Sequence, residues 1–385
     1  MNPAIDLPAP DAEALAHSER VAAHIRSEIA AAGGWISFAR YMELALYAPG
    51  LGYYSAGARK LGAAGDFVTA PELTPLFGHT LARQLAQAMG EGLEEILEVG
   101  AGSGALAASV LEELERLHAL PARYLILELS ADLRERSRDT LAARVPHLLE
   151  RVAWLNRLPP SFCGVILGNE VLDAMPVHQV QQHSGRVDEL GVEIAEGAFR
   201  VAPRPAEKAL LEAAVALSLP EDYCTEIGLA AQAFMRSIGE CLEKGVVLFI
   251  DYGFPAHEFY HPDRREGTLM CHYRHRAHDD PFFLPGLQDI TAHVDFSAIA
   301  TAAVEAGLEP AGYATQAQFL INCGITDVLA QVPVDDVLRY LPLSNQANRL
   351  LSPAEMGELF KAIAFSKHWQ VPLLGFSQGD RAHTL

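Results

Sequence analysis

The chain has 385 residues, of which half are apolar and 20% are charged, and 29 basic against 49 acidic residues give a formal net charge of −20. This length exceeds one typical domain, and the composition is that of a folded protein with a substantial core. The acidic balance argues against binding to a nucleic-acid backbone and favours a cationic partner, such as an arginine-bearing protein segment.

The sequence predicts a cytoplasmic protein that does not insert into membranes. Met1–Asp11 shows neither a basic start with an apolar core nor an Arg-rich amphipathic run, and no apolar stretch is long enough to span a bilayer. The five cysteines are scattered without a C-x-x-C pair, which suits a reducing compartment.

The N-terminal region is predicted to contain helices and a long binding loop. Apolar residues at helical spacing predict a helix over 12–32, and a second helix is expected from Ser37 to Tyr47. The glycine-dotted stretch 52–71 is long for a connector, so it favours a lid or binding loop. Thr74-Pro75 predicts the start of a third helix.

Five apolar runs, separated mostly by helical patterns, predict the strands of a parallel sheet. They lie at 94–99, 123–128, 151–155, 164–169 and 245–251. This alternation builds a doubly wound, Rossmann-like α/β core through right-handed crossovers.

Other patterns are inserted into or follow this core. Residues 176–202 alternate with period two and contain turn residues, which predicts an antiparallel β insertion. A helix with its apolar stripe from Ile227 to Leu242 is expected before the fifth strand, and a crossover helix over 297–307. Beyond Thr326 we expect helices, and then a last edge strand at 373–376.

These signals divide the chain into N-terminal helices with the covering loop, a first core part, a β-rich insertion, a second core part, a helical insertion and a last strand. The corresponding ranges are 1–90, 91–175, 176–220, 221–315, 316–370 and 371–385. The insertions are expected to form a second, smaller domain.

The stretch Glu98-Val-Gly-Ala-Gly-Ser-Gly104 joins a predicted strand to a predicted helix. Glycines at 100, 102 and 104 allow positive φ and a close approach of a ligand to the helix N-terminus. The pattern fits both dinucleotides and S-adenosylmethionine. Glu98 favours S-adenosylmethionine, because a carboxylate there suits ammonium and sulfonium charges better than a pyrophosphate. A nicotinamide cofactor and a merely structural turn remain the alternatives.

Two further candidates for binding the cofactor lie at the ends of the second and third predicted strands. Glu128 ends the second apolar run, where a carboxylate can accept hydrogen bonds from both ribose hydroxyls. Trp154, near the end of the third strand, can cover an adenine ring or pack into the core.

The remaining strand ends place Asn169, Glu170, Asp173 and Asp251 where a substrate would bind. A protonated guanidinium needs carboxylates to hold it and localise its charge, and these acids are of the required kind. The alternatives are that Asp173 caps a turn before Pro176 and that Asn169 and Glu170 simply end a strand.

Five histidines and Cys271 crowd residues 257–278. Pro255 and Pro262 disfavour a regular helix there, and no tight Cys/His or His/carboxylate spacing occurs. We therefore expect a polar loop and no metal site.

With these residues in place, the chain resembles the MidA-like methyltransferase family along most of its length. The matching segments are Leu46-Tyr47, Gly52-Tyr53-Tyr54, Gly65-Asp66-Phe67-Val68-Thr69, Glu72, Glu98–Gly104, Glu128-Leu129-Ser130, Asn169-Glu170, Asp173–Pro176, Asp251-Tyr252-Gly253, Tyr273-Arg274-His275, Pro285-Gly286, Asp289–Phe296 and Met356–Phe360. In the glycine turn the chain departs from many relatives, which have Arg and Thr in place of Ser103 and Ala105. This difference is expected to concern the neighbourhood of the cofactor's carboxylate tail.

The resemblance implies a class I fold with S-adenosylmethionine as cofactor, Gly65-Asp66-Phe67 folded over it and Asn169-Glu170 beside the transferable methyl. Together with the residues above, the residues expected to bind the cofactor are Gly65, Asp66, Phe67, Thr69, Glu98, Gly100, Gly102, Gly104, Glu128, Leu129, Trp154 and Asn169. The resemblance adds five residues that are expected to bind the substrate: Tyr252, Arg274, His275, His293 and Asp295.

The mitochondrial members of that family support complex I assembly and are linked to arginine methylation of a complex I subunit. The expected function is therefore methylation of a protein, preferably an arginine of a respiratory-complex subunit, by a monomer or homodimer. A small-molecule methyltransferase and a non-enzymatic assembly factor are the alternatives.

Overall fold

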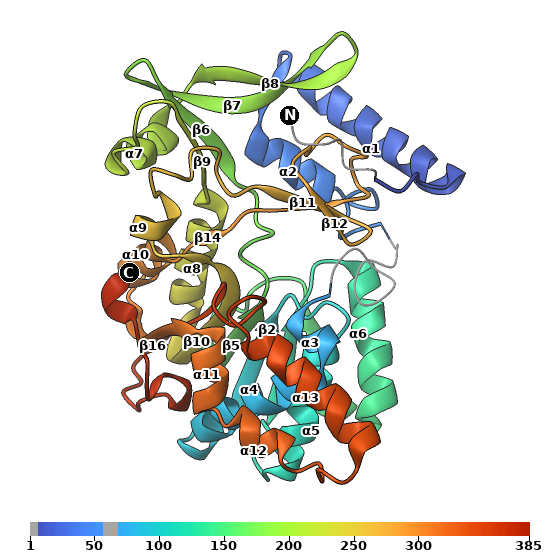
Figure 1. Ribbon diagram of the computed structural model, residues 1–385, viewed down its shortest axis with the longest axis vertical. Coiled ribbons are helices and arrows are strands. Elements are labelled where there is room, and N and C mark those ends of the chain that lie inside the picture. The colour runs from blue at the N-terminus through green and yellow to red at the C-terminus, as the bar shows by residue number, and fades with distance from the viewer. Residues whose placement is uncertain (1–6, 57–67) are drawn as a thin grey trace. The chain divides into compact units, whose positions relative to one another are not determined.

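The computed structural model describes residues 7–56 and 68–385, which form two compact units (Figure 1). Unit 1 comprises Met1–Phe67, Leu172–Ala233 and Ala256–Asp295. Unit 2 comprises Val68–Val171, Phe234–Pro255 and Phe296–Leu385. The boundaries predicted from the sequence group the chain differently, because they assign 256–295 to the core and keep 75–90 with the N-terminal helices.

Unit 2 is built on a mixed sheet with the order β15-β16-β10-β5-β2-β3-β4. The strands are β2 (Glu95–Val99), β3 (Arg123–Leu127), β4 (Val152–Leu155), β5 (Phe162–Asn169), β10 (Leu242–Phe254), β15 (Glu309–Thr315) and β16 (Phe360–Lys367). β2, β3, β4, β5 and β10 run parallel, as their apolar sequences predicted. β16 is antiparallel to both of its neighbours.

Helices surround this sheet. They are α3 (Ala70–Leu73), α4 (Pro75–Gly90), α5 (Ala105–Arg116), α6 (Ala131–Arg144), α10 (Phe296–Glu305), α11 (Gln316–Asn322), α12 (Ile325–Leu329) and α13 (Val337–Leu351), with α8 (Leu229–Cys241) shared between the units. α4 begins where predicted, because the Thr74 side chain accepts a hydrogen bond from Leu76 N and Pro75 occupies the first turn. The apolar faces of α4 and α5 and the sheet residues Ile96, Val165 and Leu248 belong to one buried core.

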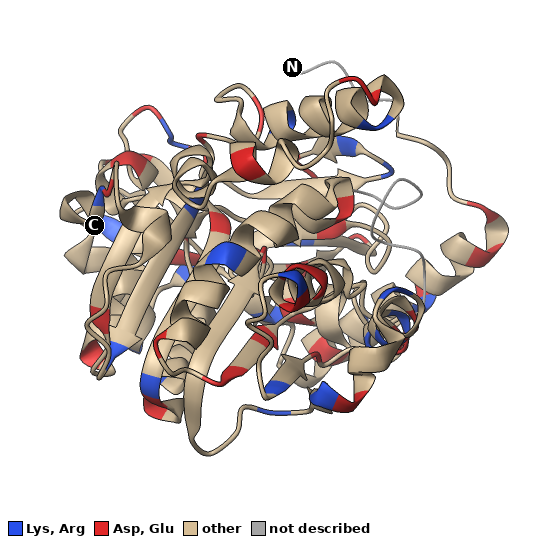
Figure 2. Cartoon of the chain, turned by 90° about the horizontal axis from the view of Figure 1, so that it is seen from below, with Lys and Arg blue, Asp and Glu red and all other residues tan. Residues whose placement is uncertain are grey.

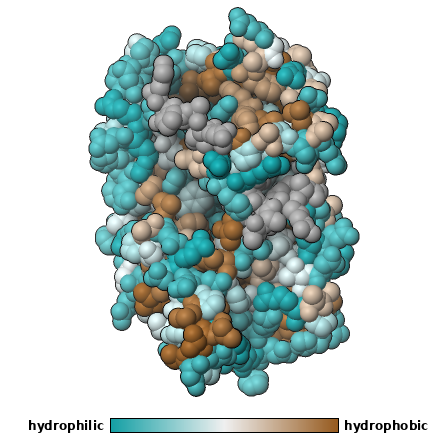
Figure 3. All heavy atoms as spheres, turned by 45° about the vertical axis from the view of Figure 1, so that its right-hand side comes forward, coloured by the Kyte–Doolittle hydropathy of each residue, from teal (hydrophilic) through white to brown (hydrophobic). Residues whose placement is uncertain are grey.

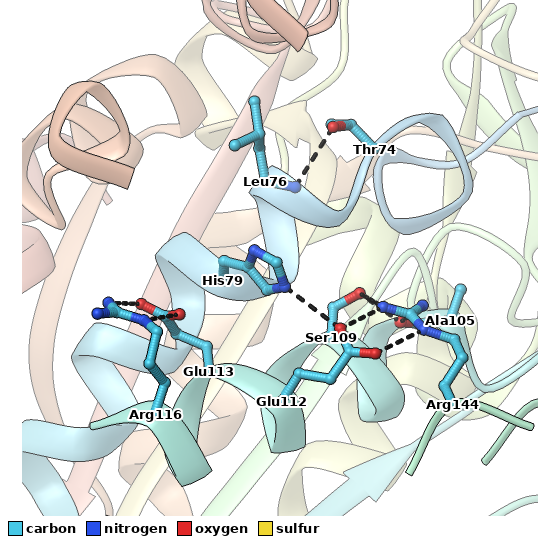
Figure 4. A network of polar contacts seen from close by, with 9 residues as sticks. All are labelled: Thr74, Leu76, His79, Ala105, Ser109, Glu112, Glu113, Arg116 and Arg144. Carbon is cyan, nitrogen blue, oxygen red and sulfur yellow. Dashed lines mark hydrogen bonds and ion pairs between the residues drawn. The ribbon is translucent and has the colours of Figure 1, made fainter. Parts of the chain in front are cut away.

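A polar network joins α4, α5 and α6 (Figure 4). Arg144 Nη2 donates to Glu112 Oε2 at 2.6 Å and to Ser109 Oγ at 3.0 Å, and His79 Nε2 lies 3.4 Å from Glu112 Oε2. Partial burial raises the pKa of Glu112, but the hydrogen bond and charge of Arg144, together with His79, outweigh it and lower the pKa overall. The network therefore links the three helices through hydrogen bonds between charged side chains.

Unit 1 combines an antiparallel sheet with helices α1 (Ala12–Ala31), α2 (Phe38–Tyr47), α7 (Lys208–Ala216) and α9 (Ala256–Phe259). The sheet order is β1-β7-β6-β9, with β8 paired to β7, and the strands are β1 (Trp35–Ser37), β6 (His178–His183), β7 (Arg186–Ala195), β8 (Ala198–Pro205) and β9 (Tyr223–Ile227). The antiparallel strands predicted over 176–202 are thus confirmed. A smaller sheet contains β11 (Met270–Tyr273), β12 (Arg276–His278) and β13 (Asp289–Thr291), and β14 (Val294–Asp295) follows.

The helix predicted before the fifth strand is confirmed as α8, but it begins at Leu229 rather than at Ile227. Ile227 itself ends β9, because pairing of β9 with β6 takes precedence over its helical spacing with Ala231. The predicted edge strand at 373–376 is a 3-10 turn, Leu374–Phe376. The last strand is β16, whose residues are almost all buried because it lies between β10 and β15 rather than at an edge.

Charged residues concentrate on helices, loops and strand ends, and the middle of the strands is largely uncharged (Figure 2). Among the described residues, no helix combines the length and the apolar character needed to cross a membrane. The part of the predicted covering loop over 57–67 lies outside the described residues.

Candidate active site

The glycine turn of unit 2 takes a conformation that requires glycine. Gly100, Gly102 and Gly104 have φ of 67°, 55° and 82°. A Cβ on Gly104 would lie 2.8 Å from Ser137 Cα, so a side chain there would collide with α6 as well as strain the backbone. Gly100 N donates to Leu127 O at 2.9 Å, which ties the turn to the end of β3. The turn therefore presents backbone at the start of α5, where an adenosyl ligand can approach.

Glu128 follows β3 and points at this turn. It is buried, and it accepts hydrogen bonds from Ser130 N at 2.9 Å and from Gly102 N at 3.4 Å. Burial raises its pKa, and the backbone N–H groups of Ser130 and Gly102 oppose that rise. The position beside Gly102 suits the predicted acceptor of two ribose hydroxyls.

Glu98 lies beneath the turn. Only 2% of it is exposed, and Tyr124 OH donates to its Oε2 at 2.7 Å. Burial raises the pKa of Glu98 to about 7; the hydrogen bond from Tyr124 opposes this rise and the charge of Glu128 adds to it. At neutral pH Glu98 is therefore only partly ionised, and its carboxyl group is already engaged within the sheet.

Trp154 at the end of β4 is held from two sides. Its Nε1 donates to Ser137 Oγ at 2.9 Å, and the Arg138 guanidinium lies 4.6 Å from the ring centroid. The ring also packs against the core of unit 2, as the alternative interpretation of this residue expected. Leu129, by contrast, is 75% exposed.

Glu170 follows β5 in a conformation that is rare for a residue with a side chain, with φ of 52°. Glu170 N donates to Ile250 O at 2.9 Å, and its Oε1 accepts from Asn169 Nδ2 at 3.0 Å and from Ala70 N at 3.3 Å. Because β5 lies beside β2 in the sheet, this turn and the glycine turn share one sheet edge. Backbone strain held by several contacts is typical of functional sites.

Asp251 in β10 supports the Glu170 turn. It is fully buried, its Oδ2 accepts from Val171 N at 3.1 Å, and its Oδ1 accepts from Tyr252 N at 2.9 Å. Both oxygens are therefore engaged by backbone, which fits a positioning role better than contact with a substrate. The neighbouring Tyr252 packs edge-on against Phe360 at a centroid distance of 5.3 Å.

Helix α3 connects the two turns of unit 2. Its first residue, Ala70, donates to Glu170, and Ser103 of the glycine turn donates to Glu72 Oε1. Thr69, at the N-cap of α3, makes no side-chain capping bond. The Glu72–Ser103 pair was not predicted as part of a site, because 31 residues separate its members in the sequence.

The other predicted residues fall in unit 1, at several places. Asp173 is buried, and its carbonyl accepts from Ala292 N at 3.0 Å. Asp295 accepts from Tyr260 OH at 2.9 Å, and His293 N donates to Thr268 Oγ1 at 3.1 Å.

Arg274 and His275 lie apart from these. They occupy the turn between β11 and β12, at the opposite end of β11 from the pairing of Met270 with Thr291. The structure therefore does not bring them next to His293. Gly65, Asp66 and Phe67 lie outside the described residues.

Tyr47 and Tyr54 of unit 1, from the matched family segments, surround the chain near Asp173. Their rings stack at a centroid distance of 5.4 Å, Tyr47 OH donates to Ala174 O at 2.8 Å, and Tyr54 OH donates to Asp289 Oδ1 at 2.8 Å. Burial raises the pKa of Tyr54 well above its usual value, and the charges of Asp289 and Asp173 add to this rise. These contacts fix the segment that follows the Glu170 turn.

Within the described residues, one group has the spacing of a metal site: His183, Glu221 and Asp222 have ligand atoms within 4.8 Å of one another. All three are exposed, and Glu221 Oε2 also accepts from Gly185 N at 3.4 Å. This group lies at the β6–β7 turn and outside the histidine-rich stretch 257–278.

Comparison with known proteins agrees with this geometry. Residues 78–314 match the sequence profile of the family described as "Putative S-adenosyl-L-methionine-dependent methyltransferase". The chain belongs to this family. S-adenosylmethionine is accordingly its cofactor.

Related proteins cover nearly the whole methyltransferase chain. It is 27% identical to the Drosophila melanogaster "Protein arginine methyltransferase NDUFAF7 homolog, mitochondrial" over 98% of this chain and 93% of that protein. It is 30% identical to the Rattus norvegicus protein arginine methyltransferase NDUFAF7 over 91% and 84%. A Burkholderia thailandensis crystal structure bound to S-adenosyl-homocysteine is 53% identical, with a TM-score of 0.96 over 99% of this chain and 100% of that one.

Proposed function

We propose that this methyltransferase modifies an arginine side chain of another protein. The observation that carries the proposal is the Glu170 carboxylate, held in a strained conformation at the carboxyl end of β5, next to the strand that leads to the glycine turn. The names of the relatives, which are protein arginine methyltransferases, support the same substrate class.

A carboxylate at this position can bind the positively charged guanidinium of an arginine acceptor. When bound, S-adenosylmethionine supplies a methyl group activated by its sulfonium charge. Glu170 would hold the guanidinium and localise its positive charge away from the attacking nitrogen. That nitrogen forms the new N–C bond as the C–S bond breaks, the sulfonium becomes a neutral thioether, and one proton leaves the methylated nitrogen.

The neighbours of Glu170 would keep it in place. Asn169 and Ala70 both donate to Glu170 Oε1, and Asp251 fixes the backbone on its C-terminal side. Because these contacts are made by the protein itself, the carboxylate is pre-organised for its acceptor.

The net charge of −20 favours a basic acceptor segment. Among such proteins, a respiratory complex I-type subunit is the preferred acceptor on the strength of the family resemblance. A small-molecule acceptor and a non-enzymatic assembly role are the competing functions.

The test is incubation of the protein with cell extract and S-adenosylmethionine labelled with tritium on the methyl group, followed by mass spectrometry of the labelled species. We expect label on arginine of a polypeptide. In Glu170→Gln, labelling should fall about 100-fold while S-adenosyl-homocysteine affinity stays within about twofold of the wild type, because the lost charge acts on the transition state.

Glu135→Gln, a change of the same chemistry at an exposed position of α6, is the matched control and should label normally. Label on metabolites alone would favour the small-molecule reaction. No transfer to any component would favour the assembly role.

A further inference from the structure

We propose that Glu72 binds the α-ammonium group of the methionine part of S-adenosylmethionine, with Ser103 orienting its carboxylate. The proposal concerns the cofactor alone and does not depend on the identity of the acceptor.

The cofactor's amino-acid end needs two kinds of partner. Its carboxylate needs N–H or O–H donors, and its ammonium needs an anionic or carbonyl acceptor. The glycine turn and the start of α5 offer backbone N–H groups, but an acceptor for the ammonium must come from a side chain or carbonyl beside them.

Most carboxyl groups around the two turns of unit 2 are poor candidates for binding the ammonium, because they have other partners or another expected role. Glu98 is buried, bonded to Tyr124 and only partly ionised at neutral pH. Glu128 faces Gly102 and follows β3, where we expect the ribose to bind. Asp251 is fully buried and accepts two backbone N–H groups.

Glu72 differs from these groups in its surroundings. It is part-exposed, and its contact is with the Ser103 hydroxyl, which belongs to the glycine turn itself. Ser103 Oγ in turn accepts from Ala105 N at 3.3 Å, so the hydroxyl is fixed between the start of α5 and the carboxylate. A neutral donor leaves the negative charge of Glu72 uncompensated by this contact, which suits it to pair with a cation.

The location of Glu72 along α3 supports the same assignment. Two residues earlier in this single helical turn, Ala70 N contacts Glu170, which we place at the methyl end of the site. Ala70 and Glu72 lie about 3 Å apart along the helix axis, so α3 runs from the proposed methyl end to the proposed ammonium end. In methionine, two methylene groups separate the sulfur from the carbon that bears the ammonium, a comparable span.

Isothermal titration calorimetry with two probes tests the assignment. The probes are S-adenosyl-homocysteine and its deamino analogue, S-(5′-deoxyadenosyl)-4-mercaptobutyrate, which keeps the carboxylate and lacks the ammonium. In Glu72→Gln we expect S-adenosyl-homocysteine to bind about tenfold more weakly, the size of effect of one charge-assisted hydrogen bond. The analogue should bind the variant and the wild type equally.

Ser103→Ala is the second variant, and it also decides the question if Glu72→Gln does not fold. Loss of the orienting hydroxyl should weaken S-adenosyl-homocysteine about threefold, the scale of a weak hydrogen bond, and leave the analogue unaffected. Glu135→Gln serves as the control of equal chemistry. Equal losses for both probes, or no loss for S-adenosyl-homocysteine, would overturn the proposal. Arginine methylation could still be absent with this result intact, so the two proposals fail separately.

Discussion

At the scale of single residues, burial decides what an acidic side chain can do. Glu98, Glu128 and Asp251 lie at or near the ends of predicted strands, and the sequence assigns the first two to the cofactor and the third to the substrate. In the structure Glu98 accepts a hydrogen bond from Tyr124 and Glu128 accepts one from Gly102 N. Asp251 accepts hydrogen bonds from backbone N–H groups. Full burial removes Asp251 from contact with a ligand, whereas the carboxylate of Glu128 has further acceptor positions beyond its hydrogen bonds to Ser130 and Gly102.

The raised pKa of Glu98 makes stability depend on pH. Because its pKa is about 7 in the fold and 4.5 in the ordinary state, the folded protein holds an extra proton between these values. Stability should therefore fall as pH rises through this window, by up to about 3 kcal/mol. In Glu98→Gln this contribution is absent, so the variant should gain stability relative to the wild type from pH 5 to pH 8. Thermal unfolding across this range measures it, and parallel curves for the two proteins would contradict the assignment.

The two backbone bonds of Asp251 predict a different result for Asp251→Asn. The amide keeps one acceptor oxygen and turns an N–H donor toward a backbone N–H, which should cost about 1–3 kcal/mol of folding free energy. Because the Glu170 turn loses its support, methyl transfer should fall more than S-adenosyl-homocysteine affinity. Denaturant unfolding combined with calorimetry and a transfer assay checks this. If affinity and transfer fall equally, Asp251 does not act through the Glu170 turn.

At the scale of elements, local sequence and tertiary pairing contribute in different ways. Thr74-Pro75 starts α4 where expected, because a cap needs only neighbouring residues. Ile227 shares the helical spacing of the stripe that follows it, yet it belongs to β9 because β6 supplies hydrogen-bonding partners. The same applies to β1, whose three residues pair with β7 and carry too short a pattern to be predicted.

The polar network between α4, α5 and α6 predicts how Arg144→Gln changes the stability of the protein. The lowered pKa of Glu112 means that this interaction stabilises the fold above the ordinary carboxyl pKa and is lost as pH falls through the folded-state value. The variant should be less stable by about 0.5–1 kcal/mol at pH 7, since the groups are a third exposed, and should approach the wild type near pH 3.

Arg116→Gln is the control for this network (Figure 4), because Arg116 pairs with Glu113 within α5 alone. This variant removes an ion pair while leaving the contacts between the three helices in place. Chemical denaturation at both pH values measures the difference. An Arg144→Gln deficit that persists unchanged at pH 3 would assign the effect to packing instead.

At the scale of the whole molecule, the chain combines a strongly acidic composition with several buried apolar clusters among the described residues. Teal and brown areas alternate over the face drawn in Figure 3, so apolar side chains also reach the surface. The exposed ones include Val334, Val337, Leu338 and Leu341, three of which lie at the start of α13. The charge is thus spread over a surface that also has apolar areas.

Ligand binding should stabilise the whole protein selectively. At one hundred times its dissociation constant, S-adenosyl-homocysteine should add about 2.7 kcal/mol to the free energy of unfolding. NAD at the same concentration should add nothing, because the turn has the carboxylates of Glu128 and Glu72 beside it rather than groups that neutralise a pyrophosphate. Thermal unfolding with each ligand measures this, and equal protection by NAD would reopen the dinucleotide interpretation of the glycines.

The sequence alone determined the strand-helix alternation and the glycine turn, because each depends on spacing within a few residues. The cofactor class followed from Glu98 and from the family resemblance along most of the chain. The predicted site residues themselves remain to be tested by the variants above. Only the tertiary structure decided that β16 lies inside the sheet, that Asp251 supports the Glu170 turn, and that Glu72 meets Ser103. These facts depend on contacts between residues far apart in the chain, and such contacts form only when the elements pack together.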